Sequence, residues 1–172
     1  TIYSMNIFLD TEFTDFPERE FDLISIGLVD ENGREFYAEL TDYRQEACSD
    51  FVKQVVLPLL KKHPNTVWGN KFQVAVKLNE WLKQYDTGSE LANICFDYNG
   101  DWHWFAHLMN MLPPEELVKN ITATNIWGSL DPMKLDWFWK EKDCIGWKQH
   151  MALYDAHANK FAYKPLVRER NG

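Results

Sequence analysis

The sequence predicts one α/β domain, residues 1–172, built on a mixed five-stranded sheet that is flanked by helices. Two observations lead to this fold class. Three strand-like apolar runs come first in the chain, and the later strand-like runs alternate with helical patterns. An antiparallel meander followed by parallel strands with intervening helices accounts for this order. A length of 172 residues suits a single domain with a sizeable core.

The N-terminal third predicts the meander. Residues 5–9 form a short apolar run that stops at Asp10, and residues 21–30 form a second run. An Asn-Gly pair within residues 31–34 predicts a hairpin turn, after which residues 35–40 return as the third strand.

The rest of the chain predicts helices and two further strands. Ser49 is a plausible cap for a helix over residues 49–62, and the apolar spacing predicts another helix over residues 71–86. Strands are expected over residues 91–97 and 121–127. The remaining helices are expected over residues 101–111, near residues 134–140 and over residues 147–163.

The composition limits the classes of function. A net charge of −8 disfavours a grip on long duplexes, because that affinity comes from neutralising phosphates. Carboxylates that hold divalent cations would make the site far less negative. The odd set of Cys48, Cys95 and Cys144 lacks a CxxC spacing, which argues against disulfides and zinc and favours a cytoplasmic location. No apolar run approaches a membrane span.

The two ends of the chain carry weaker signals. The first residues show no secretory signal, and we expect residues 1–4 to be a non-native or flexible start before a native Met5. Residues 164–172 are expected to be a tail. The basic side chains of the last helix and tail are expected to be solvated rather than bound to phosphates; they are Lys160, Lys164, Arg168 and Arg170.

Acidic residues gather where predicted elements end. Asp10 and Glu12 close the first strand, and because residues i and i+2 of a strand project to one side, the two can reach one cation. A solvated strand end is the alternative. Asp97 follows a later strand, and Asp101 opens the next helix, where an N-cap is the alternative role.

A third cluster lies near the C-terminus. His150 precedes Asp155 by five positions, which on a helix corresponds to a rotation of about 140°. The two side chains therefore do not stack on one helix face, but they can flank one cavity from different directions. A surface or capping role is the alternative for His150.

In order and spacing, these clusters resemble the DEDDh-type 3′–5′ exonucleases of the ribonuclease H-like superfamily. The motifs extend from residue 10 to residue 156, and the stretch over residues 23–27 is similar to the family's second strand. The resemblance is strongest to a small subgroup of bacterial and phage exoribonuclease-like proteins, which are similarly short and rich in tryptophan. The motifs read Asp10-Thr11-Glu12-Phe13-Thr14, Asp101 and His150-x4-Asp155-Ala156.

The chain departs from the family at its central motif. Many members carry His-Asn-x-x-Phe-Asp before the central helix, whereas this chain has Phe-Asp-Tyr-Asn-Gly-Asp over residues 96–101. Two aspartates therefore compete for the third ligand position. We predict Asp101, because it begins an apolar helix start as in the family, with Asp97 as the runner-up behind the ligands.

The resemblance implies a metal-dependent exonuclease that degrades single-stranded nucleic acid from its 3′ end, with RNA preferred, and releases 5′-mononucleotides. Two Mg²⁺ or Mn²⁺ ions are expected, because such paired cations take carboxylate ligands and assist phosphodiester hydrolysis. His150 is the expected general base, since its ordinary pKa of about 6.5 is close to working pH. The expected metal ligands are Asp10, Glu12, Asp101 and Asp155.

The resemblance also places the residues after Glu12 beside the terminal nucleotide. Phe13 would pack on a base or sugar, with core packing as its alternative, and the backbone of Thr14 would contact the sugar. Tryptophans in apolar helical patterns are instead expected in the core; they are Trp81, Trp104, Trp137 and Trp139.

Two other functions stay open at this point. One is a DNA-directed or endonucleolytic nuclease of the same superfamily. The other is a non-enzymatic acidic interaction module, whose carboxylates would point into separate regions of solvent instead of into one cleft. A homodimer also stays open.

Overall fold

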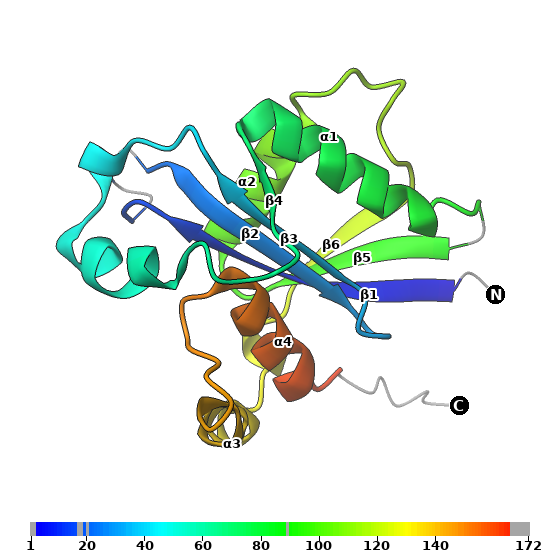
Figure 1. Cartoon of the computed structure of the whole chain (residues 1–172). Coiled ribbons are helices and arrows are strands. Elements are labelled where there is room, and N and C mark those ends of the chain that lie inside the picture. The colour runs from blue at the N-terminus through cyan, green and yellow to red at the C-terminus, as the bar shows by residue number, and fades with distance from the viewer. Residues whose placement is uncertain (1–2, 17–18, 20, 89, 166–172) are drawn as a thin grey trace, which may run out of the picture.

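The computed structural model describes residues 3–16, 19, 21–88 and 90–165 (Figure 1). Within these residues the strands form one mixed sheet with the order β4-β3-β2-β1-β5-β6. β1, β2 and β3 form the predicted antiparallel meander, whereas β5 and β6 are parallel to β1. The strands are β1 (Tyr3–Phe13), β2 (Leu23–Asp30), β3 (Glu35–Leu40), β4 (Val67–Gly69), β5 (Glu90–Phe96) and β6 (Ile121–Asn125).

The sheet has one strand more than the sequence predicts. β4 contains three residues and pairs in parallel with β3 at the edge of the sheet. Three residues are too few to show the alternation of apolar and polar residues that identifies a half-buried strand in a sequence. The mixed character of the sheet is confirmed, and the strand count of five is corrected to six within the described residues.

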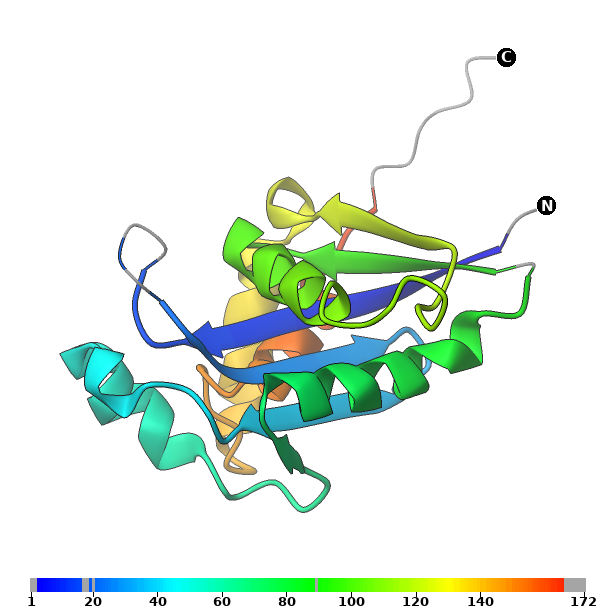
Figure 2. The ribbon, with the colours of Figure 1, turned by 90° about the horizontal axis from the view of Figure 1, so that it is seen from above.

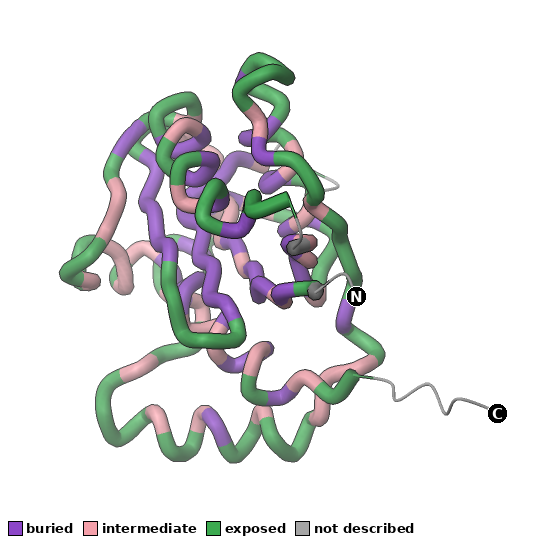
Figure 3. Tube along the Cα trace, turned by 90° about the vertical axis from the view of Figure 1, so that its right-hand side faces the viewer, coloured by how far each residue is buried: buried purple, intermediate pink, exposed green. Residues whose placement is uncertain are grey.

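Helices cover both faces of the sheet. α1 (Lys71–Leu82) and α2 (Asn99–Met109) pack on one face, where the largest hydrophobic cluster lies (Figure 2). α4 (Ala152–Ala162) packs on the other face, and α3 (Pro132–Asp143) packs against α4. Most residues of the central strands are buried, whereas α3 buries Phe138 and leaves most of its length exposed (Figure 3).

β1 is longer at both ends than the predicted run. Tyr3 and Ser4 already pair with β5, so these two residues of the expected flexible start belong to the sheet. At its other end β1 continues past Asp10 to Phe13, with an irregularity in the register after Glu12. Asp10 and Glu12 therefore lie within a regular extended strand.

The predicted helix over residues 49–62 is wrong as a single α-helix. The segment folds into a π-helical turn, η2 (Val52–Val56), and a 3-10 turn, η3 (Leu57–Leu59). Pro58 explains the break, because a proline inside an α-helix lacks the N–H donor and clashes with the preceding turn. The predicted cap is confirmed, since the Ser49 hydroxyl accepts a hydrogen bond from the Val52 amide at 3.2 Å.

The last helix is also shorter than the predicted range of residues 147–163. It begins at Ala152. Gly146 and His150 both have positive φ, at 84° and 69°, and this backbone conformation is incompatible with a right-handed helix. His150 consequently lies in a loop, two residues before the helix.

Gly27 allows this helix to approach the sheet closely. A Cβ atom at Gly27 would lie 2.4 Å from the backbone nitrogen of Leu153, in the first turn of α4. Gly27 pairs with Asp10 across β1 and β2. The missing side chain therefore lets the start of α4 lie directly beside the acidic end of β1.

The C-terminal segment is held to α3 at its beginning. The Lys164 amide donates to the Ser129 carbonyl at 2.8 Å, and the Lys164 side chain forms an ion pair with Asp131. Arg168 and Arg170 lie outside the described residues. Within the described part of the chain, no helix is long and apolar enough to cross a membrane.

Candidate active site

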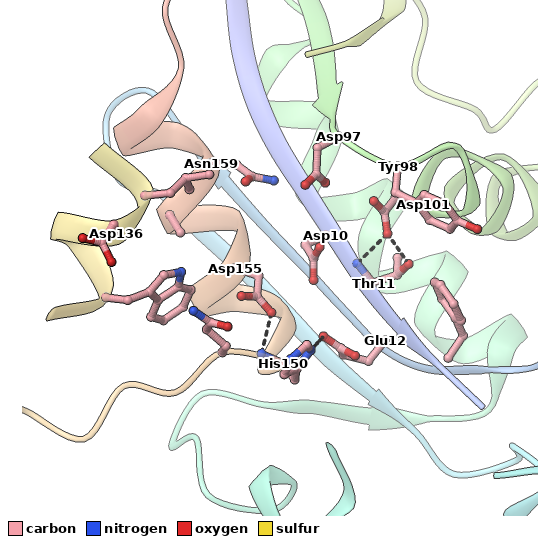
Figure 4. Close-up of a pocket in the computed structure, with 15 residues that line it drawn as sticks. Asp10, Thr11, Glu12, Asp97, Tyr98, Asp101, Asp136, His150, Asp155 and Asn159 are labelled. Carbon is pink, nitrogen blue, oxygen red and sulfur yellow. Dashed lines mark hydrogen bonds and ion pairs between the residues drawn. The ribbon is translucent and has the colours of Figure 1, made fainter. Parts of the chain in front are cut away.

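One pocket of about 480 Å³ collects all the predicted catalytic side chains (Figure 4). β1 contributes two of them, the segment from the end of β5 into α2 contributes two, and the start of α4 contributes two. Carboxylates that were separate caps and surface charges, as in an interaction module, would not converge in this way. The residues are Asp10, Glu12, Asp97, Asp101, His150 and Asp155.

Asp101 is held against β1 by two hydrogen bonds. Its Oδ1 atom accepts from the Thr11 amide at 3.1 Å and from the Thr11 hydroxyl at 2.6 Å. α2 begins at Asn99 with Tyr98 as its N-cap, so Asp101 lies inside the first turn and is not the cap. This corrects the capping alternative for Asp101. Thr11, which alternates with Asp10 and Glu12 along β1, thereby fixes the central carboxylate beside them.

The potential ligand atoms form two groups. One oxygen each from Asp10, Asp97 and Asp101 lies within 4.8 Å of the others. A second group, from Glu12, His150 and Asp155, has the same spread. Asp97 thus lies directly beside Asp101 rather than behind it, and both aspartates face Asp10.

Burial and mutual repulsion raise the pKa values of these carboxyl groups. The pKa of Asp10 lies well above its ordinary value, first because the group is buried and then because Asp101 and Asp155 are close. Burial raises the pKa of Asp101 to about 8, although the Thr11 hydroxyl opposes the shift. Burial raises the pKa of Asp155 to about 7 against the hydrogen bond from the His150 amide.

The donor set fits divalent cations. Asp10 Oδ2 and Asp101 Oδ2 are buried and have no hydrogen-bond partner among the described residues. Buried carboxylate oxygens are costly unless they are paired or coordinate a metal. Hard cations such as Mg²⁺ and Mn²⁺ take oxygen ligands of this kind, and their positive charge would offset the repulsion within the cluster.

His150 lies at the rim of the pocket in a constrained conformation. Its backbone amide donates to Asp155 Oδ2 at 2.8 Å, and its Nδ1 lies 4.0 Å from Glu12 Oε1. Its ring meets the edge of the Phe51 ring at a centroid distance of 5.1 Å. Partial burial lowers the pKa of the imidazole below 6.5, which favours the neutral form at pH 7. A positive φ at a site residue is the kind of local strain that surrounding contacts must hold.

The two predicted substrate contacts differ in position. Phe13 lines the pocket and stacks on Tyr98 at a centroid distance of 6.0 Å, while its other contacts belong to the core. Thr14 is fully buried. Its amide donates to the Asp22 carbonyl at 2.9 Å, and its own carbonyl accepts from the Ser49 amide at 2.9 Å. The backbone groups of Thr14 therefore join two loops instead of facing the pocket.

An apolar slot of about 540 Å³ adjoins the acidic pocket, and the sequence analysis did not predict it. Phe16, in the loop after β1, is 71% exposed, and Phe51, in the helical turn that leads into η2, is 53% exposed; both line the slot together with His150. Phe13 and Val52 complete its apolar wall. The sequence places Phe16 between two predicted strands and Phe51 in a predicted helix, and these two segments meet only in the folded chain.

The tryptophans divide into core and site residues. Trp104 is buried and Trp81 packs against the core, as predicted. Trp137 is 50% exposed and stacks on Phe161, so its predicted core position is wrong. Trp139 is half-buried and lines the acidic pocket, which also corrects its predicted role. Because α3 packs on α4 and not on the sheet, its apolar residues do not all reach a core.

Comparisons with known proteins agree with the motif resemblance. No protein-family model matches the sequence. The chain is 38% identical over 85 residues to proteins named 3′-5′ exoribonuclease from two strains of Mycobacterium tuberculosis. The aligned segment covers 49% of this chain and 50% of each relative. The match thus spans about half the length of these curated relatives.

The fold has a counterpart among solved structures. A crystal structure described as a full-length 3′-exonuclease superposes with a TM-score of 0.56, at 16% identity, and the match covers 93% of this chain and 80% of that one. At this identity the likeness concerns the fold alone. It agrees with the predicted architecture, a mixed sheet flanked by helices. The name of the Mycobacterium tuberculosis relatives agrees with the resemblance to 3′–5′ exonucleases.

Proposed function

We propose that this chain is a divalent-cation-dependent exonuclease that removes nucleotides from the 3′ end of single-stranded nucleic acid, with RNA as its preferred substrate. The observation that carries the proposal is the convergence of four carboxylates and His150 on one pocket. The name 3′-5′ exoribonuclease of the Mycobacterium tuberculosis relatives supports both the polarity and the choice of RNA.

Four side chains would hold two Mg²⁺ or Mn²⁺ ions: Asp10, Glu12, Asp101 and Asp155. Asp97 is the runner-up, because its carboxylate shares a group with Asp10 and Asp101. When bound, two such cations polarise the phosphate, lower the pKa of the attacking water and stabilise the leaving oxygen.

His150 is the proposed general base. Its lowered pKa keeps the imidazole neutral at pH 7, which is the form that accepts a proton from water. The hydrogen bond from its amide to Asp155 holds the loop against α4, and contact with Phe51 limits rotation of the ring. A base must lie within reach of the attacking water, and His150 lines the pocket in which such a water would lie.

The apolar slot would receive the base of the terminal nucleotide. Phe13, Phe16 and Phe51 offer aromatic surfaces, and stacking of a base on an aromatic side chain contributes about 1–3 kcal/mol irrespective of the base. The slot and the acidic pocket share Glu12 and His150, so a base in the slot brings its 5′-phosphate to the carboxylates. Attack of water on that phosphate, with cleavage of the bond to the 3′ oxygen of the upstream nucleotide, would release a 5′-mononucleotide and leave a new 3′ hydroxyl.

The test uses RNA and DNA oligomers labelled at either end, incubated with Mg²⁺, Mn²⁺ or EDTA. We expect stepwise shortening from the 3′ end, faster on RNA, which stops in EDTA and in the Asp155→Asn variant. Glu80→Gln removes an exposed carboxylate on α1 and serves as the matched control. Undiminished cleavage in excess EDTA refutes the proposal, and equal cleavage of a circular substrate identifies an endonuclease instead.

A further inference from the structure

A groove of about 790 Å³ adjoins the acidic pocket and is lined by residues of the η2–η3 segment, of α3 and of the loop before α4. We call it the α3 groove. It shares a wall with the acidic pocket, formed by Asp136, Trp139, Gln149 and His150. Beyond that wall it is lined by Gln54 and Leu59 on one side and by Lys140, Trp147 and Lys148 on the other. The volume lies in the range of ligand-binding clefts.

We propose that the α3 groove binds the nucleotides that lie 5′ to the scissile phosphate. This inference rests on the proposed exonuclease function. The acidic pocket shares Glu12 and Phe13 with the apolar slot and a different set of residues with the α3 groove, and His150 lines all three. A strand whose terminal base occupies the slot and whose reacting phosphate meets the carboxylates therefore continues into the α3 groove.

The side chains of the groove suit a single strand. Trp139 supplies an aromatic wall at the junction with the acidic pocket, and stacking on such a wall does not depend on the base. The amide side chains of Gln54 and Gln149 are exposed and can both donate and accept hydrogen bonds.

The two lysines supply the charge that phosphates need. Lys140 forms an ion pair with Asp136, and Lys148 forms one with Asp143, and all four side chains are more than half exposed. Exposed ion pairs contribute little to stability, so an ammonium group can turn from its aspartate to a phosphate at small cost. Asp136 and Asp143 also line the groove, so its formal charge with both lysines is zero, whereas the whole chain carries −8.

The positive charge continues beyond the groove. A second hollow of about 300 Å³ shares Leu59 and Lys148 with the α3 groove and adds Lys62 and His63. Lys148 thus lines both hollows, with Lys140 in the one that adjoins the acidic pocket and Lys62 in the other, which suits a polyanionic strand. Phosphate contacts of this kind position a nucleic acid without reading its sequence.

Another hollow borders the acidic pocket on the opposite side and fits an upstream strand less well. It measures about 450 Å³ and includes Asp97, Tyr98, Asn125 and Trp127. Trp127 offers an aromatic surface, but none of the described residues that line this hollow is basic, and Asp97 adds negative charge. Phosphates therefore favour the α3 groove.

The test compares two kinds of substrate. The p-nitrophenyl ester of uridine 5′-monophosphate carries the terminal nucleotide and the reacting phosphate but nothing upstream. RNA oligomers of two to eight nucleotides add the upstream strand. We expect KM of the wild-type protein to fall as the oligomer lengthens over the first few nucleotides.

The variant Lys140→Ala/Lys148→Ala should lose this dependence on length. Its kcat/KM for oligomers should fall about tenfold more than its kcat/KM for the ester. The slope of log KM against log salt concentration should also decrease by about 1.4, since each single-strand phosphate contact contributes about 0.7. Two control variants should retain the wild-type dependence of KM on oligomer length. Lys77→Ala removes a lysine from a comparably exposed ion pair on α1, and Trp127→Ala removes the aromatic surface of the other hollow.

Three results would overturn the inference, and they differ from failure of the proposed function. An unchanged length dependence and salt slope in the double lysine variant would remove the groove from the substrate path. If kcat/KM of the double lysine variant fell equally for the ester and for the oligomers, the lysines would act at the reacting phosphate and not on the upstream nucleotides. Loss of the length dependence in Trp127→Ala would assign the strand to the other hollow. If the wild-type protein hydrolyses neither substrate, the proposed function fails and the groove assignment falls with it.

Discussion

Replacing Asp101 by Asn should change stability in opposite directions with and without metal. The asparagine retains an oxygen that can accept the two hydrogen bonds from Thr11, but it removes one negative charge from the cluster. Without cations the variant should stabilise the folded protein, because it removes an ionisable group whose charge is disfavoured first by burial and then by the nearby Asp97. With Mn²⁺ the loss of a ligand should remove much of the stabilisation that the cations provide.

The pKa of Asp101 sets the magnitude and the pH window. Its pKa is raised from 3.8 to about 8, so the folded state binds the proton more tightly than the unfolded state. Stability from this group is therefore fully present below about pH 4 and is lost as pH rises toward 8. One pKa unit corresponds to about 1.4 kcal/mol, so the raised pKa of Asp101, which keeps the carboxyl largely protonated in the folded state, costs the metal-free protein roughly 4 kcal/mol at pH 7 and about 2 kcal/mol at pH 5.

Thermal unfolding in EDTA and in millimolar Mn²⁺, at pH 5 and pH 7, measures both effects. For a chain of this size 1 kcal/mol shifts Tm by about 2–4 °C, so Asp101→Asn should raise Tm in EDTA by roughly 8–16 °C at pH 7 and by less at pH 5. Wild-type Tm should rise with Mn²⁺, because the cations bind the folded site. Asp50→Asn, at an exposed position outside the pocket, controls for charge alone. The reasoning is refuted if Asp101→Asn is no more stable than wild type in EDTA at pH 7, or if both proteins gain equally from Mn²⁺.

Three further variants test the division of roles in the site. His150→Ala should keep Mn²⁺ affinity, measured by calorimetry, and lose about 10²–10⁴-fold in single-turnover rate, because it removes a base and not a ligand. The residual rate of His150→Ala should rise with pH, because hydroxide replaces the missing base. A single-turnover rate equal to that of the wild type would exclude His150 as the general base. Asp97→Asn should lose about 10–100-fold in rate if Asp97 supports the ligands, whereas complete loss alongside an active Asp101→Asn would exchange their roles. Gly27→Ala should lower both Tm and kcat, since its Cβ would meet the Leu153 backbone at 2.4 Å and overpacking costs about 1–3 kcal/mol. Unchanged kcat would show that the start of α4 tolerates displacement.

Local patterns were sufficient for the parts of the protein that depend on near neighbours. The two-residue period of a strand placed Asp10 and Glu12 on one side of β1, and the structure retains that arrangement. The Asn-Gly turn joined β2 to β3, and the Ser49 cap was correct. These features follow from backbone geometry and from hydrogen bonds within a few residues, so the amino-acid sequence alone determines them.

Local patterns failed where a distant contact or a backbone break decides the outcome. Pro58 divides a segment whose apolar spacing suggests one helix, and the positive φ of His150 delays the start of α4. Trp139 has the spacing of a core residue, yet it lines the pocket because α3 packs on α4 and leaves its other faces open.

The tertiary structure decided which acidic residues act together. Asp10, Asp101 and Asp155 are far apart along the chain, and they meet because β1 lies at the centre of the sheet with α2 on one face and α4 on the other. The same packing brings Asp97 beside Asp101 and joins Phe16 to Phe51 in the apolar slot. Sequence spacing indicates which side of its own element a residue occupies. Whether side chains from different strands and helices come together depends on how those elements bury their apolar faces against one another.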